Sequence, residues 1–281
     1  MSKVLAVDLD GTLFYPKQVK RCIPRKNIKF LQRWIDSGNR LVLVTSRSQS
    51  FTAKLKDEIN RPFDVLNCTS AQIYHDEQLI FEKKMPNADL ERILGEIDKR
   101  YHPIACFITS KNQPCVIHQH SKINFFVQVI YRLWYFFQFK YREPSLVSDE
   151  AYNKELKEGD IYKVMIFFGL GKNKGKLSKE INKELREKFP EIESSWSLIV
   201  NELTPIGCNK GEGLKRYCEL VNIDPNDLYV VGDSGNDITM FNYFHENSYC
   251  MAHAYPSVKK YAKHIIAHVY NLDKLVLKGE K

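Results

Sequence analysis

Residues 3–14 read KVLAVDLDGTLF, an apolar run that ends in two aspartates followed by Gly-Thr. The run from Val4 to Val7 is typical of a central parallel strand that helices cover on both faces. Side chains repeat every second residue in an extended chain, so Asp8 and Asp10 leave the strand in the same direction. Two carboxylates this close repel each other unless a positive charge lies beside them. A hard cation with oxygen ligands, such as Mg²⁺, meets that need.

The same arrangement occurs twice more along the chain. Residues 39–48, NRLVLVTSRS, end an apolar run on Thr45, and residues 227–241, DLYVVGDSGNDITMF, end one on Asp233. Helical patterns over 24–38 and 211–223 precede these two runs. Alternating strands and helices predict an α/β fold with a doubly wound, Rossmann-like parallel sheet, in which ligands bind beyond the carboxyl ends of the strands.

Composition is that of an ordinary globular protein. The chain has 281 residues, of which 43% are hydrophobic and 27% charged, so a large core and two domains are expected. Its seven cysteines show no C-x-x-C pair, and the four apolar residues near the N-terminus are too few for a signal peptide. We therefore expect reduced thiols and a cytoplasmic location.

Two segments raise the question of a larger partner. The net charge is +8, but the densest basic segment, 171–188, has interleaved acidic residues and an apolar stripe, which favours a solvated amphipathic helix over nucleic-acid binding. Polar residues interrupt the aromatic segment 123–141 too often for a membrane span, which favours an amphipathic helix or a dimer contact. We expect no nucleic-acid or membrane partner, and a monomer or homodimer.

The polar residues at the strand ends suit chemistry on a phosphate ester. Asp8 can act as a nucleophile that forms an aspartyl-phosphate, and Asp10 can protonate the leaving oxygen and then activate water. The Thr45 hydroxyl and neighbouring amides can hold the phosphoryl oxygens, whose charge Lys210 neutralises. Asp233 can bind Mg²⁺ together with Asp8 and the backbone carbonyl of Asp10.

Taken together, D-x-D-G-T at 8–12, a strand-ending Thr45, Lys210 and G-D-x-x-N-D at 232–237 resemble the haloacid dehalogenase-like hydrolases. Within that superfamily, LTPIGCNKGEGLKRY and GDSGNDITMF look like the Cof-type phosphatases. The resemblance covers about residues 1–80 and 200–270. It implies a Mg²⁺-dependent phosphatase that hydrolyses a small phosphorylated metabolite, such as a sugar phosphate, through an aspartyl-phosphate.

The predicted site has three groups of residues. The catalytic group is Asp8, Asp10, Thr45 and Lys210. The metal ligands are Asp8, Asp10, Asp233 and Asp237, with Asn236 and Asp237 positioning Lys210, the metal or its waters. The substrate-binding residues are Gly11, Thr12, Ser46, Arg47, Asn236 and His253.

Spacing predicts an inserted domain. Between Thr45 and Lys210, one helix and one strand leave more than a hundred residues, enough for an α+β cap over 82–198 within a core formed by 1–81 and 199–281. The pattern within the insert predicts helices over 88–101 and 171–188 and strands over 104–110, 114–120, 162–169 and 195–202. In the family that this chain resembles, such a cap closes over the core site and chooses the substrate.

The chain also departs from the family pattern. Ser46, Ser70 and Ala252 stand where the family usually has glycine, and His253 stands where it usually has asparagine close to the phosphate. The retained aspartates and Lys210 favour an active enzyme. Two alternatives stay open: a phosphotransferase or phosphomutase that uses the same aspartyl-phosphate, and a regulatory protein that binds a phosphorylated ligand with weak turnover.

Overall fold

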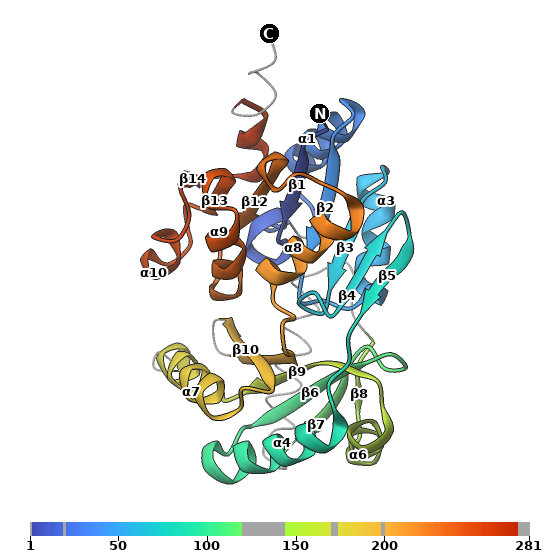
Figure 1. Cartoon of the computed structure of the whole chain (residues 1–281), viewed down its shortest axis with the longest axis vertical. Coiled ribbons are helices and arrows are strands. Elements are labelled where there is room, and N and C mark those ends of the chain that lie inside the picture. The colour runs from blue at the N-terminus through green and yellow to red at the C-terminus, as the bar shows by residue number, and fades with distance from the viewer. Residues whose placement is uncertain (1, 19–20, 120–143, 170–173, 198–199, 275–281) are drawn as a thin grey trace. The chain divides into compact units, whose positions relative to one another are not determined.

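The computed structural model describes residues 2–18, 21–119, 144–169, 174–197 and 200–274. Within these ranges the chain forms two compact units, which Figure 1 shows with their elements labelled. The first unit contains the described residues of 1–81 and 210–281, and the second those of 82–137 and 142–209. The aromatic segment 123–141 lies outside the described residues. No helix within the described ranges is both long and apolar enough to cross a membrane.

The first unit is built on an eight-stranded sheet with the order β14-β13-β12-β1-β2-β3-β4-β5. Its strands are β1 (Val4–Val7), β2 (Arg40–Val44), β3 (Asp64–Asn67), β4 (Gln72–His75), β5 (Gln78–Glu82), β12 (Leu228–Gly232), β13 (Ser248–Met251) and β14 (His264–Ile266). Every strand from β14 to β3 is parallel to its neighbours, and β4 returns antiparallel to β3. Since β1 pairs with β12 and β2, the three apolar runs of the sequence form the centre of the sheet.

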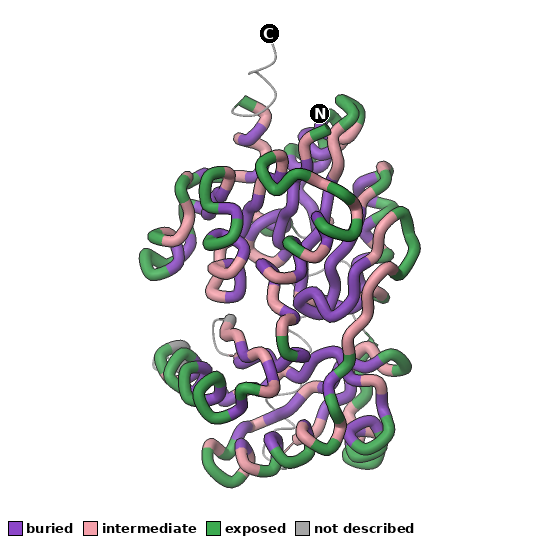
Figure 2. Tube along the Cα trace, in the orientation of Figure 1, coloured by how far each residue is buried: buried purple, intermediate pink, exposed green. Residues whose placement is uncertain are grey.

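Helices cover both faces of this sheet. The α-helices of the unit are α1 (Arg25–Asp36), α2 (Gln49–Thr52), α3 (Lys56–Ile59), α8 (Lys210–Val221), α9 (Ile238–Tyr243) and α10 (Pro256–Lys259). On one face Phe30 and Trp34 of α1 pack on Val7, and on the other Tyr217 of α8 and Phe241 of α9 lie in a separate apolar cluster. Figure 2 shows the central strands as mostly buried, and β2 and β12 each contain one half-buried residue. The predicted doubly wound α/β core is therefore confirmed. Strands that helices cover on both faces are expected to be nearly continuous apolar runs.

The second unit is an α+β domain with a six-stranded sheet of order β10-β11-β9-β6-β7-β8. Its elements are α4 (Asn87–Tyr101), β6 (Ala105–Ser110), β7 (Val116–Gln119), β8 (Leu146–Val147), α6 (Asp149–Glu158), β9 (Ile161–Phe167), α7 (Lys174–Lys188), β10 (Ile192–Ser197) and β11 (Val200–Pro205). Its core joins Leu90 of α4, Ile108 of β6, Ile166 of β9 and Leu185 of α7.

One prediction for this unit is wrong. The sequence predicts a single strand over 195–202, but β10 and β11 are two antiparallel strands. No glycine, proline or asparagine lies between Ser197 and Val200 to indicate a turn. Because β11 also pairs with β9, residues 200–205 belong to the second unit, and the chain reaches the first unit at Lys210, later than the predicted boundary at 198/199.

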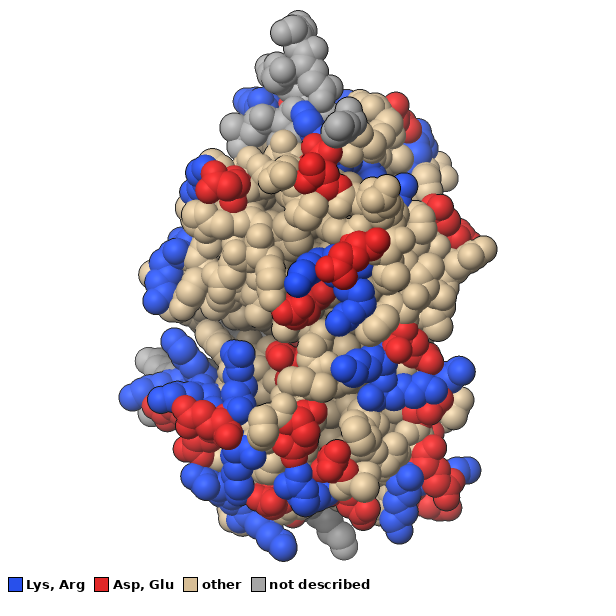
Figure 3. Space-filling view, viewed as in Figure 1, with Lys and Arg blue, Asp and Glu red and all other residues tan. Residues whose placement is uncertain are grey.

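The lysine-rich segment forms α7, as its apolar stripe predicts. Ile181 and Leu185 are buried, while lysines alternate with glutamates on the exposed side. Two of these pairs, Lys176–Glu180 and Lys183–Glu187, are four residues apart with nitrogen–oxygen distances of 3.8 Å. Figure 3 shows basic and acidic side chains interspersed around this helix.

Candidate active site

Three neighbouring strands bring three of the predicted site residues to one edge of the sheet. Asp8 follows β1, Thr45 follows β2 and Asp233 follows β12, and the three strands are parallel neighbours. Main-chain hydrogen bonds continue past the strand ends: Asp8 N donates to Val231 O at 3.0 Å, and Thr45 N donates to Leu66 O at 2.9 Å. The side chains that follow these strands therefore start from fixed backbone positions.

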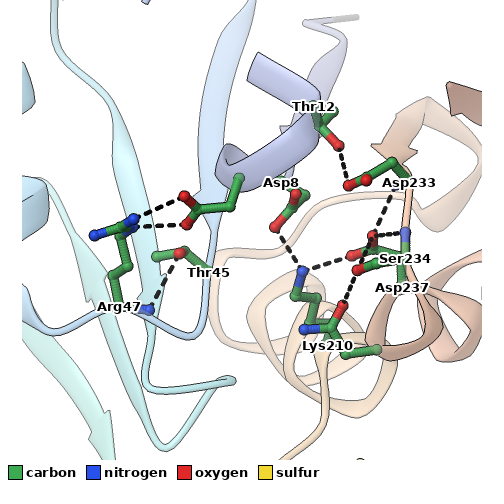
Figure 4. A network of polar contacts seen from close by, with 10 residues as sticks. Asp8, Thr12, Thr45, Arg47, Lys210, Asp233, Ser234 and Asp237 are labelled. Carbon is green, nitrogen blue, oxygen red and sulfur yellow. Dashed lines mark hydrogen bonds and ion pairs between the residues drawn. The ribbon is translucent and has the colours of Figure 1, made fainter. Parts of the chain in front are cut away.

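Lys210 lies between two carboxylates (Figure 4). It is the first residue of α8, its side chain is 1% exposed, and its Nζ lies 2.7 Å from Asp8 Oδ1 and 2.5 Å from Asp237 Oδ1. The other oxygen of Asp237 accepts the main-chain N–H groups of Asp233 and Ser234 at 2.8 and 2.9 Å. Asp237 thus connects the ammonium group to the loop after β12.

The cluster contains more carboxylates than ammonium groups. Burial raises the pKa of Asp8 well above its ordinary value; the Lys210 ammonium opposes this shift, while the carboxylates of Asp237 and Asp233 reinforce it. For Lys210, burial lowers the pKa, but Asp237 and Asp8 outweigh burial and hold the pKa above its usual range. A protonated Lys210 therefore offsets only part of the negative charge around Asp8.

Two acidic side chains of this cluster fit a cation. Asp8, Asp233 and Asp237 each place a carboxylate oxygen within 4.8 Å of the others. Asp8 Oδ2 is buried and has no hydrogen-bond partner among the described residues, and such an acceptor suits a hard cation. Asp233 is fixed by Thr12, whose hydroxyl donates to Asp233 Oδ1 at 3.0 Å. Asp8 and Asp233 therefore fit Mg²⁺ as ligands.

Gly11 makes room for this group. Its φ of 86° is in the left-handed region, and a Cβ at this position would lie 2.3 Å from Asp233 Oδ2. Gly232 does the same for Asp237, because a Cβ there would lie 2.5 Å from its Cγ. Both glycines of the two acidic motifs are thus required by the approach of a carboxylate.

Two of the four predicted metal ligands have other partners. Both oxygens of Asp237 accept hydrogen bonds within the protein, which suits positioning of Lys210 better than metal binding. The Asp10 carboxylate faces Arg47, with Arg47 Nε 2.6 Å from Asp10 Oδ2 and Nη2 2.7 Å from Oδ1. The Asp10 side chain is not in the acidic cluster found among the described residues, so the predicted metal contact of Asp10 stays with its backbone carbonyl.

The predicted substrate-binding residues are divided between two places. Arg47 lies beside Thr45, whose Oγ1 accepts the Arg47 N–H at 3.1 Å, and half-buried Ser46 lies between them in the chain. Thr12 and Asn236 lie on the Asp233 side, where Asn236 Oδ1 accepts the Ser234 hydroxyl at 2.7 Å.

His253 lies next to Asp233. Its Nε2 is 3.8 Å from Asp233 Oδ2, and its side chain is 33% exposed. Burial raises the pKa of Asp233, and the His253 imidazole opposes this rise. The ring of His253 packs on Tyr15, with centroids 4.1 Å apart. Sequence reasoning missed Tyr15, since one tyrosine after an apolar turn carries no signal of its own.

A left-handed turn after β3 fixes the loop that carries Thr45 and Arg47. Cys68, Thr69 and Ser70 have φ angles of 49°, 55° and 73°, which is rare for residues with a side chain. Cys68 N donates to Arg47 O and Thr69 N donates to Thr45 O, both at 3.0 Å. The turn thus stabilises the backbone of two predicted site residues. The departure at Ser70 was the signal in the sequence, but it did not indicate this role.

Comparison with known proteins identifies the family. The family model of the haloacid dehalogenase-like hydrolases, which describes the sequences of that family, matches residues 5–274 of this chain. The chain belongs to this family. It is 23% identical to YkrA of Bacillus subtilis, a protein named as a phosphatase, over 93% of this chain and 90% of that protein. It is 22% identical to YcsE of the same organism, a 5-amino-6-(5-phospho-D-ribitylamino)uracil phosphatase, over 85% of this chain and 79% of YcsE.

Solved structures of this family share the fold. A haloacid dehalogenase-like hydrolase from B. subtilis superimposes with a TM-score of 0.77 at 19% identity, covering 98% of this chain and 99% of that one. The subclass IIB sugar phosphatase BT4131 superimposes with a TM-score of 0.75 at 20% identity, covering 98% of both chains. The fold of this hydrolase is thus a known architecture.

Replacing Lys210 with methionine should destabilise the protein strongly. The Lys210→Met change leaves two buried carboxylates without their shared cation, so we expect the free energy of unfolding to fall by about 3–5 kcal/mol in denaturant titrations. Lys56 pairs with Glu77 at the surface, where its side chain is 45% exposed. Lys56→Met should therefore change stability by less than about 1 kcal/mol. Equal effects of the two substitutions would contradict the central role of Lys210.

Replacing Ser70 should raise the stability of the protein. Its hydroxyl is buried without a hydrogen-bond partner among the described residues, and its φ is 73°. Ser70→Ala removes the unpaired hydroxyl, and Ser70→Gly also removes the left-handed strain, so we expect thermal stability to rise from serine to alanine to glycine. The free energy of unfolding of the glycine variant should rise by about 1–2 kcal/mol, a figure from which the larger entropy loss of glycine on folding has been subtracted. A glycine variant less stable than the natural protein would show that the Ser70 side chain has a favourable contact.

Proposed function

We propose that this hydrolase is a Mg²⁺-dependent phosphatase that acts on a small phosphorylated metabolite, a sugar phosphate or similar phosphomonoester, through an aspartyl-phosphate on Asp8. The observation that carries the proposal is the state of the Asp8 carboxylate. One oxygen bonds Lys210 at 2.7 Å, and the other is buried without a partner among the described residues. A carboxylate held in this way suits a nucleophile whose charge is offset by cations.

The surrounding residues suit the first step. Asp8 attacks phosphorus, the bond from phosphorus to the leaving oxygen breaks, and Asp10 gives its proton to that oxygen. An ammonium group has three N–H donors, of which Asp8 and Asp237 accept two, so Lys210 retains one for a phosphoryl oxygen. The Thr45 hydroxyl, which is buried at the neighbouring strand end, can donate another.

The second step reuses the same groups. Asp10 takes a proton from water, the water oxygen bonds to phosphorus, and the bond to Asp8 breaks, which frees the carboxylate and inorganic phosphate. Asp8 and Asp233 would hold Mg²⁺, which when bound supplies positive charge to the phosphoryl oxygens. Asp237 keeps Lys210 in place in both steps.

The relatives support the substrate class. Sugar phosphatase activity is named for BT4131, and a phosphorylated ribityl compound is the substrate named for YcsE. Sugar phosphates and the YcsE substrate are both small phosphomonoesters.

We propose further that the second unit, residues 82–209, selects the substrate. We also propose that His253 contacts the substrate. Seven reduced cysteines fit the reducing conditions of the cytoplasm, which we propose as the location.

Phosphate release tests this function. Purified protein should release inorganic phosphate from at least one sugar phosphate when Mg²⁺ is present and should stop when a chelator removes the metal, because the neighbouring carboxylates of Asp8 and Asp233 must be neutralised. Asp8→Asn should abolish release while the folded protein persists in circular dichroism. Activity that survives excess EDTA would contradict the metal requirement. Phosphate that appears on a second sugar rather than in water would identify a phosphotransferase.

A further inference from the structure

Arg47 holds the carboxylate of Asp10 with both ends of its guanidinium group. The two hydrogen bonds, at 2.6 and 2.7 Å, engage both carboxylate oxygens and form the parallel, bidentate arrangement that fixes a carboxylate in orientation as well as position. In Figure 4 Arg47 lies on one side of Asp8, and Lys210 and Asp237 lie on the other. Two sets of charges therefore flank Asp8 separately.

Arg47 is itself held from several directions. Its guanidinium carbon lies 3.9 Å from the centroid of the Phe51 ring, and the residue is 9% exposed. Its main-chain N–H bonds Thr45 Oγ1 at 3.1 Å, and its carbonyl accepts the N–H of Cys68 at 3.0 Å. Ring stacking and backbone hydrogen bonds restrict the torsions of this buried arginine, so its guanidinium group presents two N–H donors in a fixed orientation.

We propose that Arg47 is a positioning residue, which aims the Asp10 carboxylate for proton transfer to the leaving oxygen and does not serve as the phosphate ligand that the sequence predicts. The proposal rests on the proposed phosphatase function. The two bonds to Asp10 use the Nε–H and one Nη2–H of the guanidinium group. Lys210 and Thr45 already supply donors beside the nucleophile, so the reaction does not require a phosphate contact from the remaining N–H groups of Arg47.

The Asp10 carboxyl group can accept hydrogen bonds from Arg47 and carry the transferred proton at the same time. Each oxygen has two lone-pair positions, so an oxygen that accepts from Arg47 can also carry a proton. In the transfer, the Asp10 O–H bond breaks and the proton moves to the leaving oxygen. That oxygen keeps the electron pair of its broken bond to phosphorus, and Asp10 is left as a carboxylate still bonded to Arg47.

Leaving-group dependence distinguishes the two roles of Arg47. Nitrophenolate departs without a proton, whereas phenolate is a much poorer leaving group and depends on general acid catalysis. The measurement is kcat/KM for p-nitrophenyl phosphate and phenyl phosphate, which reports only the steps up to the phosphorylation of Asp8. Arg47→Met should lower kcat/KM for phenyl phosphate by about 10²-fold or more, and for p-nitrophenyl phosphate by less than about tenfold.

Further variants make the test specific. Asp10→Asn should show the same selective loss, and the double variant should be no more selective than Asp10→Asn alone. Arg47→Lys keeps the charge but loses the fork, so it should resemble Arg47→Met. Arg40 is a matched control, since it pairs with Asp64 at 3.6 Å outside the site, and Arg40→Met should leave the ratio of the two values unchanged.

The ratio is independent of how much of a variant is folded, because both substrates are measured on one preparation. Equal losses on both substrates, with KM raised and with recovery in Arg47→Lys, would overturn the positioning role and make Arg47 a phosphate ligand. A natural protein that releases phosphate from neither aryl phosphate nor any sugar phosphate would overturn the proposed function itself, and this inference with it.

Discussion

The contact of the Lys210 ammonium with Asp8 and Asp237 is the interaction on which the site depends. It joins three segments that are distant in the sequence: the end of β1, the start of α8 and the loop after β12. An ammonium group that is 1% exposed is stable only between carboxylates that stay close to it. The parallel pairing of β12 with β1 and the close approach allowed by Gly232 meet that requirement.

Electrostatic balance then connects the fold to the proposed chemistry. Three carboxylates lie together with one ammonium group, and burial makes the remaining negative charge unfavourable. A divalent cation at Asp8 and Asp233 would offset it, and a phosphoryl group would be bound through the same positive charges. Asp10 bonds Arg47 and is not part of this cluster, so the proposed proton donor and the proposed nucleophile have different surroundings.

The sequence predicts the centre of this architecture because local rules and the tertiary fold agree there. Val4–Val7 and the two neighbouring strands consist mainly of apolar residues, and a polar residue follows each strand, so sheet and site edge could both be inferred. Contacts between loops that are distant in the sequence could not be inferred. Three features depend on how these loops meet: the bidentate contact of Arg47 with Asp10, the hydrogen bonds to both oxygens of Asp237, and the left-handed backbone at Ser70. The prediction of a single strand over 195–202 failed for a simpler reason, since the sequence between Ser197 and Val200 contains no glycine, proline or asparagine.

The covalent intermediate on Asp8 is the central claim, and trapping it is the most direct test. A sugar phosphate that the enzyme hydrolyses is mixed with it, the reaction is quenched within one turnover, and the denatured protein is reduced with borohydride. Borohydride converts an aspartyl-phosphate to homoserine but leaves a free carboxylate unchanged. The account predicts homoserine at position 8 by peptide mass spectrometry, and none in Asp8→Asn. An unmodified Asp8 in enzyme quenched while phosphate is being released would contradict the account.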